Sequence, residues 1–197
     1  MSSSIVEVLR SLDAAMSSLG LRWYLFGAQA AILHGAARAT ADADVTVELG
    51  GVTPKALVAA LETAGFAARV DADDDEFIER SRVLPVVHVE SSLPVDVVLA
   101  GPGLEDLFFE RLTRVEVEGL SIPVASAEDM VVMKLLAGRP LDLEDARAIL
   151  EAKGPALDIG HVETLLTTLE KALDQHGLVA TLDDLRRRAK KRRRTLE

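Results

Sequence analysis

Three aspartates lie in apolar surroundings where their carboxylates could bind a divalent cation. Asp42 and Asp44 stand two residues apart at the head of an apolar segment, and residues two apart in a strand point to the same face. Carboxylates this close raise each other's proton affinity, a penalty that a divalent cation removes. Because magnesium prefers oxygen ligands, often carboxylates plus substrate phosphates, the spacing indicates a site for magnesium, or alternatively manganese, and a triphosphate. A polar strand edge in solvent would give the same pattern.

The third aspartate, Asp96, is the one charged residue in the apolar strand predicted over residues 93–99. Burying an unpaired carboxylate costs roughly several kcal/mol, so a metal shared with Asp42 and Asp44 is a natural partner. We therefore expect the three carboxylates to converge on one point. The alternative is that Asp96 alternates out to solvent.

Four residues upstream could contact phosphate. Gly27 and Ala28 end a predicted strand and open a helix, where glycine lets backbone approach an anion and the helix N-terminus favours it. Arg38 and Thr40 precede the aspartates and could bind phosphate as well. An ordinary strand–helix turn and an exposed Arg and Thr are the structural alternatives.

The combined pattern closely resembles the nucleotidyltransferase (polymerase-β-like) superfamily. The matching residues are Gly27-Ala28, His34-Gly35, Arg38-x-Thr40-x-Asp42-x-Asp44 and the later Asp96. The resemblance implies transfer of a nucleoside monophosphate from an NTP to an acceptor hydroxyl, with release of pyrophosphate. It also implies that Asp42 and Asp44 bind two metal ions and that Asp96 completes the one that activates the hydroxyl. Ala28 departs from the pattern, because many members have serine or glycine there.

A second block, residues 126–145, looks like the Lys-Leu-x-Ala-x-Arg-x-x-Asp-x-x-Asp element of AbiEii-type nucleotidyltransferases. This resemblance implies that Lys134 lies near the triphosphate and takes part in catalysis. Leu141 stands where a basic residue is usual, and a lysine lying along an amphipathic helix is the structural alternative for Lys134. The implied nucleotide-binding residues are Gly27, Ala28, Arg38, Thr40, Lys134, Arg139, Asp142 and Asp145.

The elements that must position these residues are mixed α and β at first and helical at the end. We predict helices near 5–19, 28–33, 54–65, 127–137, 142–153, 160–176 and 181–194, and strands near 22–26, 42–49, 83–90, 93–99, 114–117 and 122–124. Residues 71–80 are very acidic and indicate a surface loop or short helix. This order predicts an α/β (α+β) fold, with a mixed-sheet nucleotidyltransferase core over residues 1–125 and a helical part over residues 126–197.

The charge is unevenly distributed. The net charge is −10, yet residues 186–197 carry +7, so the other 185 residues carry −17. Eight basic side chains within residues 186–194 cover every face of a helix and repel one another, so we expect no amphipathic helix packed on an apolar core there. RNA, or the acidic body itself, could neutralise this basic tail.

The chain has no cysteine, no signal-peptide pattern and no apolar run near the ~20 residues that span a bilayer, so we expect a cytoplasmic protein without membrane contact. Three hypotheses for the acceptor compete. The AbiEii resemblance implies RNA, including tRNA ends, and a toxin paired with an antitoxin protein. Antibiotic nucleotidyltransferases imply a small molecule. A non-catalytic member would only bind nucleotide or protein, but the intact aspartate trio argues against it.

Overall fold

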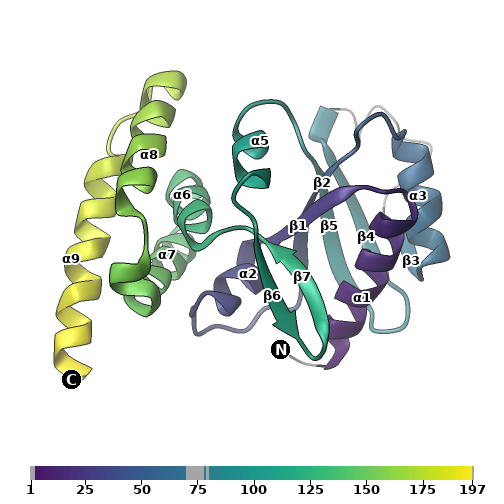
Figure 1. Cartoon of the computed structure of the whole chain (residues 1–197), viewed down its shortest axis with the longest axis horizontal. Helices are drawn as coiled ribbons and strands as arrows, with labels where there is room; N and C mark the ends of the chain where they lie inside the picture. The colour runs from purple at the N-terminus through teal and green to yellow at the C-terminus, as the bar shows by residue number, and fades with distance from the viewer. Residues whose placement is uncertain (1–2, 70–77, 79, 197) are drawn as a thin grey trace. The chain divides into compact units, whose positions relative to one another are not determined.

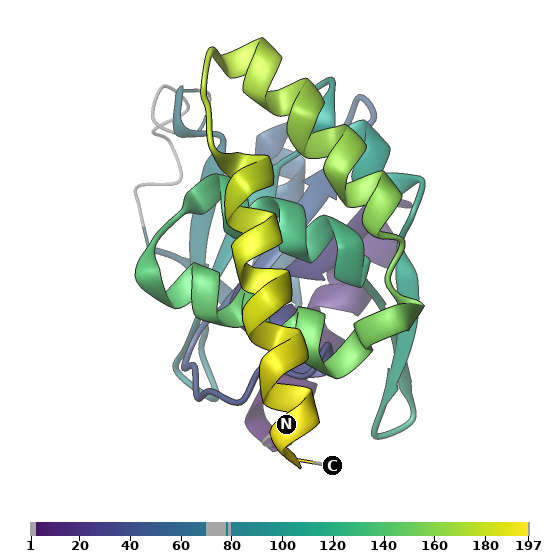
Figure 2. The same ribbon diagram turned by 90° about the vertical axis from the view of Figure 1, so that its left-hand side faces the viewer.

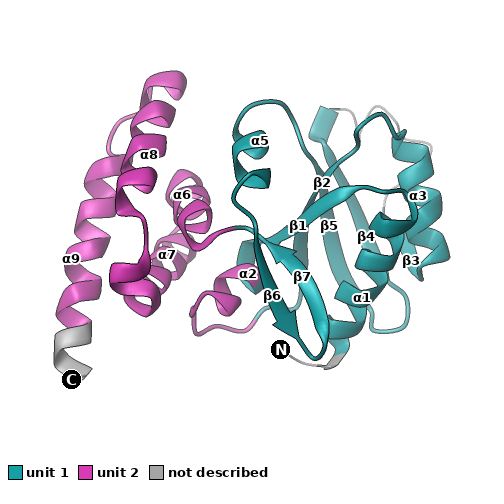
Figure 3. Cartoon of the chain, in the orientation of Figure 1, with its two compact units in different colours: residues 1–29, 40–125 teal, residues 30–39, 126–197 magenta. Residues whose placement is uncertain are grey.

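The computed structural model describes residues 3–69, 78 and 80–196. The chain divides into two compact units, shown in two colours in Figure 3. Unit 1 comprises residues 1–29 and 40–125, and unit 2 comprises residues 30–39 and 126–197. The predicted acidic segment, residues 71–80, lies almost entirely outside the described residues.

Unit 1 is built on a mixed seven-stranded sheet, counted over the described residues (Figure 1). The order is β3-β4-β5-β2-β1-β7-β6. The pairs β2–β5 and β1–β7 are parallel, and the other neighbours are antiparallel. The strands are β1 (Arg22–Phe26), β2 (Ala43–Glu48), β3 (Phe66–Ala68), β4 (Val83–His88), β5 (Leu93–Leu99), β6 (Thr113–Val117) and β7 (Leu120–Val124). The predicted mixed-sheet α/β fold is confirmed.

Helices α1 (Ser3–Ser18) and α3 (Pro54–Thr63) pack against each other on one side of the sheet (Figure 1). The α3 helix begins as its sequence predicts, because the Thr53 side chain accepts a hydrogen bond from the Ala56 backbone and Pro54 follows. The apolar side chains of the sheet and of α1 form a core with almost no exposed surface, including Leu9, Leu12, Met16, Val45, Val47, Val95 and Val97. Alternation along β2 and β5 then leaves the opposite face for polar residues.

Two elements of unit 1 were not predicted. Strand β3 is only three residues long, and helix α5 (Leu104–Phe109) follows a glycine-containing turn. Phe109 anchors α5, because its ring meets the Tyr24 ring edge-on at 4.9 Å and lies 4.7 Å from the Arg22 guanidinium carbon. These contacts are distant in sequence, so local periodicity could not reveal them.

Unit 2 contains the C-terminal helices (Figure 2). The Ser126 side chain caps the first of them by accepting a hydrogen bond from the Asp129 backbone N–H. The elements are α6 (Ala127–Ala137), α7 (Pro140–Lys153), the 3-10 turn η1 (Gly154–Ala156), α8 (Ile159–Leu173) and α9 (Leu178–Leu196). The segment 27–33 forms α2 (Gly27–Leu33), which runs from unit 1 into unit 2. Among the described residues, none of the helices is both long and apolar enough to cross a bilayer.

The basic C-terminal segment is part of α9, and the expectation that it would not pack is wrong. Leu182, Leu185 and Ala189 are buried and give α9 an apolar stripe, and the helix contacts α6, α7 and α8. Acidic side chains of unit 2 offset the repulsion between its cations. The pairs are Arg186–Glu163 at 2.7 Å, Arg188–Asp184 at 2.7 Å and Arg192–Glu151 at 3.5 Å.

Candidate functional site

The register of β2 and β5 brings Asp44 and Asp96 together on one face of the sheet. The strands are parallel neighbours, and Asp44 stands opposite Asp96 in their pairing. Opposed residues on adjacent strands project to the same side, and the strands are about 4.8 Å apart. The residues on either side of each aspartate, such as Val45 and Val97, are buried on the other face. Two of the three predicted carboxylates are therefore side by side.

Gly27 makes room for the Asp44 carboxylate. A Cβ at Gly27 would lie 1.9 Å from Asp44 Oδ2, and Gly27 has a φ of +66°. Both observations require glycine, because a left-handed backbone disfavours other residues and a side chain would displace the carboxylate. The following Ala28 is buried.

Asp96 has one oxygen that lacks a hydrogen bond. Its side chain is 46% exposed, but Oδ1 is shielded from solvent and has no hydrogen-bond partner in the described part of the chain. The guanidinium of Arg69 forms an ion pair with this oxygen, with Nη1 3.7 Å away. Sequence reasoning missed Arg69, because its position follows from the short strand β3, which has no local signal.

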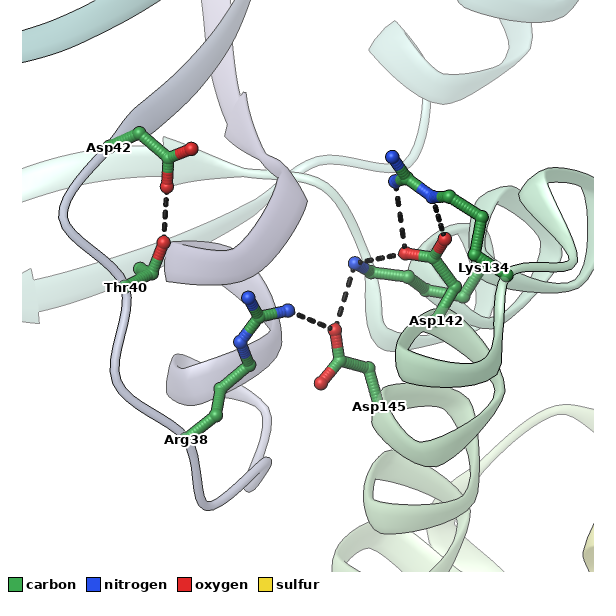
Figure 4. A network of polar contacts seen from close by, with 7 residues as sticks. Arg38, Thr40, Asp42, Lys134, Asp142 and Asp145 are labelled. Atoms are coloured by element: carbon green, nitrogen blue, oxygen red, sulfur yellow. Dashed lines mark hydrogen bonds and ion pairs between the residues drawn. The ribbon is translucent and has the colours of Figure 1, made fainter.

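Asp42 is exposed and immediately precedes β2. The hydroxyl of Thr40 donates a short hydrogen bond to Asp42 Oδ1 (Figure 4), and Gln29 donates to the Asp42 backbone oxygen at 3.3 Å. Within residues 3–69, 78 and 80–196, no three acidic or histidine side chains are grouped so that they could hold a metal ion. The structure thus brings Asp44 and Asp96 together and leaves Asp42 bonded to Thr40.

The residues present fit a hard divalent cation. The donor set consists of carboxylate oxygens, which suits magnesium or manganese. Asp96 Oδ1 is buried without a hydrogen bond, and a cation would satisfy it. Asp42 is hydrogen-bonded to Thr40, and its place in the donor set stays a prediction.

In unit 2, Lys134 is buried between two carboxylates of α7 (Figure 4). Its Nζ lies 2.9 Å from Asp142 Oδ1 and 2.9 Å from Asp145 Oδ2. All three side chains are at least nine-tenths buried. Lys134 therefore forms a buried ion cluster rather than lying along the helix surface with its charge in solvent.

Two arginines complete the cluster. Arg38 Nη1 lies 2.9 Å from Asp145 Oδ2, and Arg139 Nε donates to Asp142 Oδ2 at 2.5 Å. Three cationic side chains thus contact two carboxylates. The Arg38–Asp145 pair joins residues 107 positions apart and holds the 30–39 segment within unit 2.

The electrostatics of the cluster favour an ionised Asp142. Burial alone would raise the pKa of its carboxyl group, but the hydrogen bonds and positive charges of Arg139 and Lys134 outweigh burial and lower the pKa below the usual value of 3.8. Asp142 therefore remains a carboxylate at neutral pH.

The predicted residues fall into one group in each unit. Unit 1 holds Gly27, Ala28, Thr40, Asp42, Asp44 and Asp96, and unit 2 holds Arg38, Lys134, Arg139, Asp142 and Asp145. The first group contains three carboxylates and suits a cation, whereas the second combines one lysine and two arginines with two aspartates.

Solved structures with the same fold are nucleotidyltransferases or described as similar to them. The solution structure of the antibiotic-resistance factor ANT(2'')-Ia matches this chain with a TM-score of 0.60 and 16% identity. The match covers 88% of this chain and 97% of that chain. Its crystal structure with adenylyl-2''-tobramycin matches with a TM-score of 0.59 and 16% identity, over 87% of this chain and 99% of that one. An antigenic nucleotidyltransferase-like protein from Paracoccidioides brasiliensis matches with a TM-score of 0.55 and 16% identity, over 93% and 94% of the two chains.

Sequence comparison identifies the family. No match was found among curated proteins. These comparisons do not identify the AbiEii type, which stays a prediction. A family model described as nucleotidyltransferase of unknown function (DUF6036) matches residues 4–191. Since this match covers nearly all of the 197 residues, the chain belongs to that family of nucleotidyltransferases.

Proposed function

We propose that this protein is a magnesium- or manganese-dependent enzyme that transfers a nucleoside monophosphate from an NTP to an acceptor hydroxyl. The observation that carries the proposal is the pairing of Asp44 with Asp96 on adjacent parallel strands, beside a glycine that leaves space for the carboxylate. Family membership supports nucleotidyl transfer as the reaction class.

In the proposed reaction, the acceptor oxygen bonds to the α-phosphorus as the bond to the β-phosphate oxygen breaks, and pyrophosphate leaves. A bound divalent cation would lower the pKa of the acceptor hydroxyl and neutralise charge on the leaving group. Asp42, Asp44 and Asp96 would hold it. Asp96 would also accept the hydroxyl proton, because its Oδ1 has no hydrogen bond in the described residues.

Nucleotide binding by the unit 2 cluster is the second part of the proposal. Lys134, Arg38 and Arg139 are each paired with a carboxylate, and ammonium and guanidinium groups of this kind bind phosphate in other proteins. Arg139 is 76% exposed, which makes it the guanidinium best able to reach an anion. Gly27, Ala28 and Thr40 belong to unit 1, and their contact with nucleotide stays a prediction from the sequence.

We favour a cationic small molecule as the acceptor. The 185 residues before the basic tail carry −17, and such a charge attracts a polycation and repels RNA. The solved structure of ANT(2'')-Ia, which has a similar fold, holds such a compound in adenylylated form, adenylyl-2''-tobramycin.

RNA is the second candidate acceptor, and the basic residues of α9 favour it. Arg187, Lys190 and Arg192 are exposed on this helix. However, several of its arginines are already paired with unit 2 carboxylates, which reduces the charge available to phosphates. An antitoxin protein as partner belongs to this second candidate.

The test is to incubate the protein with each α-labelled NTP, magnesium and one acceptor at a time, using an aminoglycoside, tRNA and total RNA. Label in the aminoglycoside supports the favoured acceptor, and label in RNA supports the second. If RNA receives the label, the logarithm of its binding constant should fall with the logarithm of salt concentration, with a slope of about −0.7 per phosphate contact. The double variant Arg187→Gln/Lys190→Gln should have a shallower slope. If no acceptor or water receives label from any NTP, the proposal fails.

A further inference from the structure

We infer that Arg69 is a positioning residue that holds Asp96 before metal binds and competes with the divalent cation for its carboxylate. The inference rests on the proposed function, because it assigns the cation to Asp44 and Asp96. It assigns to Arg69 a control on cation affinity that the sequence pattern does not reveal.

A row of residues across the sheet places Arg69 in reach of Asp96. The Arg69 backbone donates to the Pro85 carbonyl at 2.9 Å, Pro85 stands opposite Asp96, and Asp96 stands opposite Asp44. Arg69 therefore lies two strands from Asp96, about 10 Å across the sheet. Only a long side chain can span this distance and still place its charge 3.7 Å from Asp96 Oδ1.

The Arg69–Asp96 ion pair is weak enough for a divalent cation to displace it. At 3.7 Å it is longer than a hydrogen bond, and Asp96 Oδ1 stays without a hydrogen bond in the described residues. The two side chains are 43% and 46% exposed, so water screens their attraction and little is lost when they separate. A fixed hydrogen-bonded pair would oppose a cation far more strongly.

The charges of Asp44, Asp96 and Arg69 determine whether Arg69 raises or lowers the affinity for a divalent cation. Asp44 and Asp96 are adjacent and repel each other, and the single positive charge of Arg69 offsets part of this repulsion without metal. A divalent cation at the same carboxylates offsets it better but is itself repelled by Arg69. Metal binding must therefore displace the guanidinium, and removing this charge should raise cation affinity.

The experiment titrates the full-length protein with Mn²⁺ alone and measures binding by electron paramagnetic resonance and calorimetry. The variants are Arg69→Gln, Arg69→Lys and Arg22→Gln. Arg22 is the matched control, because it forms an ion pair of similar exposure with Glu48 on the same sheet, four residues along β2 from Asp44. That separation is about 13 Å, beyond the Debye length of about 8 Å at physiological salt.

We expect Arg69→Gln to bind Mn²⁺ about fivefold more tightly than the wild type, since an exposed unit charge near a divalent cation has a modest effect. Arg69→Lys and Arg22→Gln should stay within about twofold of the wild type. Equal or weaker binding by Arg69→Gln overturns the inference while leaving the metal site intact. Absence of Mn²⁺ binding by all four proteins overturns both the inference and the proposed metal dependence.

Discussion

Asp44 of β2 and Asp96 of β5 occupy opposed positions on adjacent parallel strands, 52 residues apart in sequence. A shift of one residue in this register would send Asp96 to the opposite face of the sheet from Asp44. The apolar residues that alternate with both aspartates fix the register, because they must be buried beneath α1 and α3. The hydrophobic core therefore specifies the geometry of the carboxylates.

Replacing Gly27 with alanine should disturb the Asp44 carboxylate directly. The new Cβ would lie 1.9 Å from Asp44 Oδ2, so the carboxylate must move and nucleotidyl transfer should fall by about a hundredfold or more. Gly20→Ala is a matched control, because Gly20 has the same φ of +66° and no atom within 4 Å of its added Cβ. It should cost only the backbone strain, about 1 kcal/mol. Equal effects on transfer for the two variants would contradict this role of Gly27.

Replacing Lys134 with methionine should destabilise the protein strongly. The change leaves Asp142 and Asp145 buried without their shared ammonium, and breaking such a pair typically costs about 3–5 kcal/mol. Urea denaturation of the full chain would measure the free energy of unfolding. Lys171→Met is the control, because Lys171 is exposed on α8, and it should change stability by less than about 0.5 kcal/mol. A loss no greater than that of the control would show that the cluster is not structural.

The free energy of unfolding should decrease at acidic pH, because the Asp142 carboxylate becomes protonated. Its folded-state pKa lies below 3.8, so its contribution is present above the pKa of the unfolded chain and is lost as pH falls through the folded pKa. The free energy of unfolding, measured from pH 7 to pH 3, should decline below about pH 4 in the wild type. Asp142→Asn should be less stable at pH 7 and should show a shallower decline. An unchanged decline would assign the acid sensitivity to other carboxylates.

Helix α9 should contribute to stability through its apolar stripe. Leu185→Ala removes a buried side chain and should cost about 2–4 kcal/mol of unfolding free energy. Lys190→Ala changes an exposed position five residues after Leu185 on the same helix and should have almost no effect. If Leu185→Ala were as stable as Lys190→Ala, the C-terminal helix would not be packed in solution.

Most of the fold followed from local patterns in the sequence. Alternating apolar residues identified β2 and β5, and the helix predicted near residues 127–137 is α6, because these signals lie within one element. The pairing of Asp44 with Asp96 was expected from the superfamily resemblance and from the cost of an isolated carboxylate.

The features that were missed depend on contacts between distant residues. Arg69 reaches Asp96 through a three-residue strand, and Arg38 reaches Asp145 across 107 positions. The basic charge of α9 concealed its apolar stripe, because the acidic partners that neutralise it, such as Glu163 and Glu151, lie on other helices. The density of basic residues in the sequence therefore predicted repulsion, whereas in the fold acidic side chains on other helices neutralise part of this charge.

The most direct test of the central claim is the rate of magnesium-dependent pyrophosphate release in Asp44→Asn, Asp96→Asn and Glu48→Gln. Glu48 is the matched control, because it lies four residues after Asp44 on the same face of β2 and forms an ion pair with Arg22. With an NTP and the acceptor found above, the wild type and Glu48→Gln should release pyrophosphate at equal rates. Both aspartate variants should be slower by about a thousandfold. Wild-type rates in Asp44→Asn and Asp96→Asn would contradict the claim that this carboxylate pair is the catalytic centre.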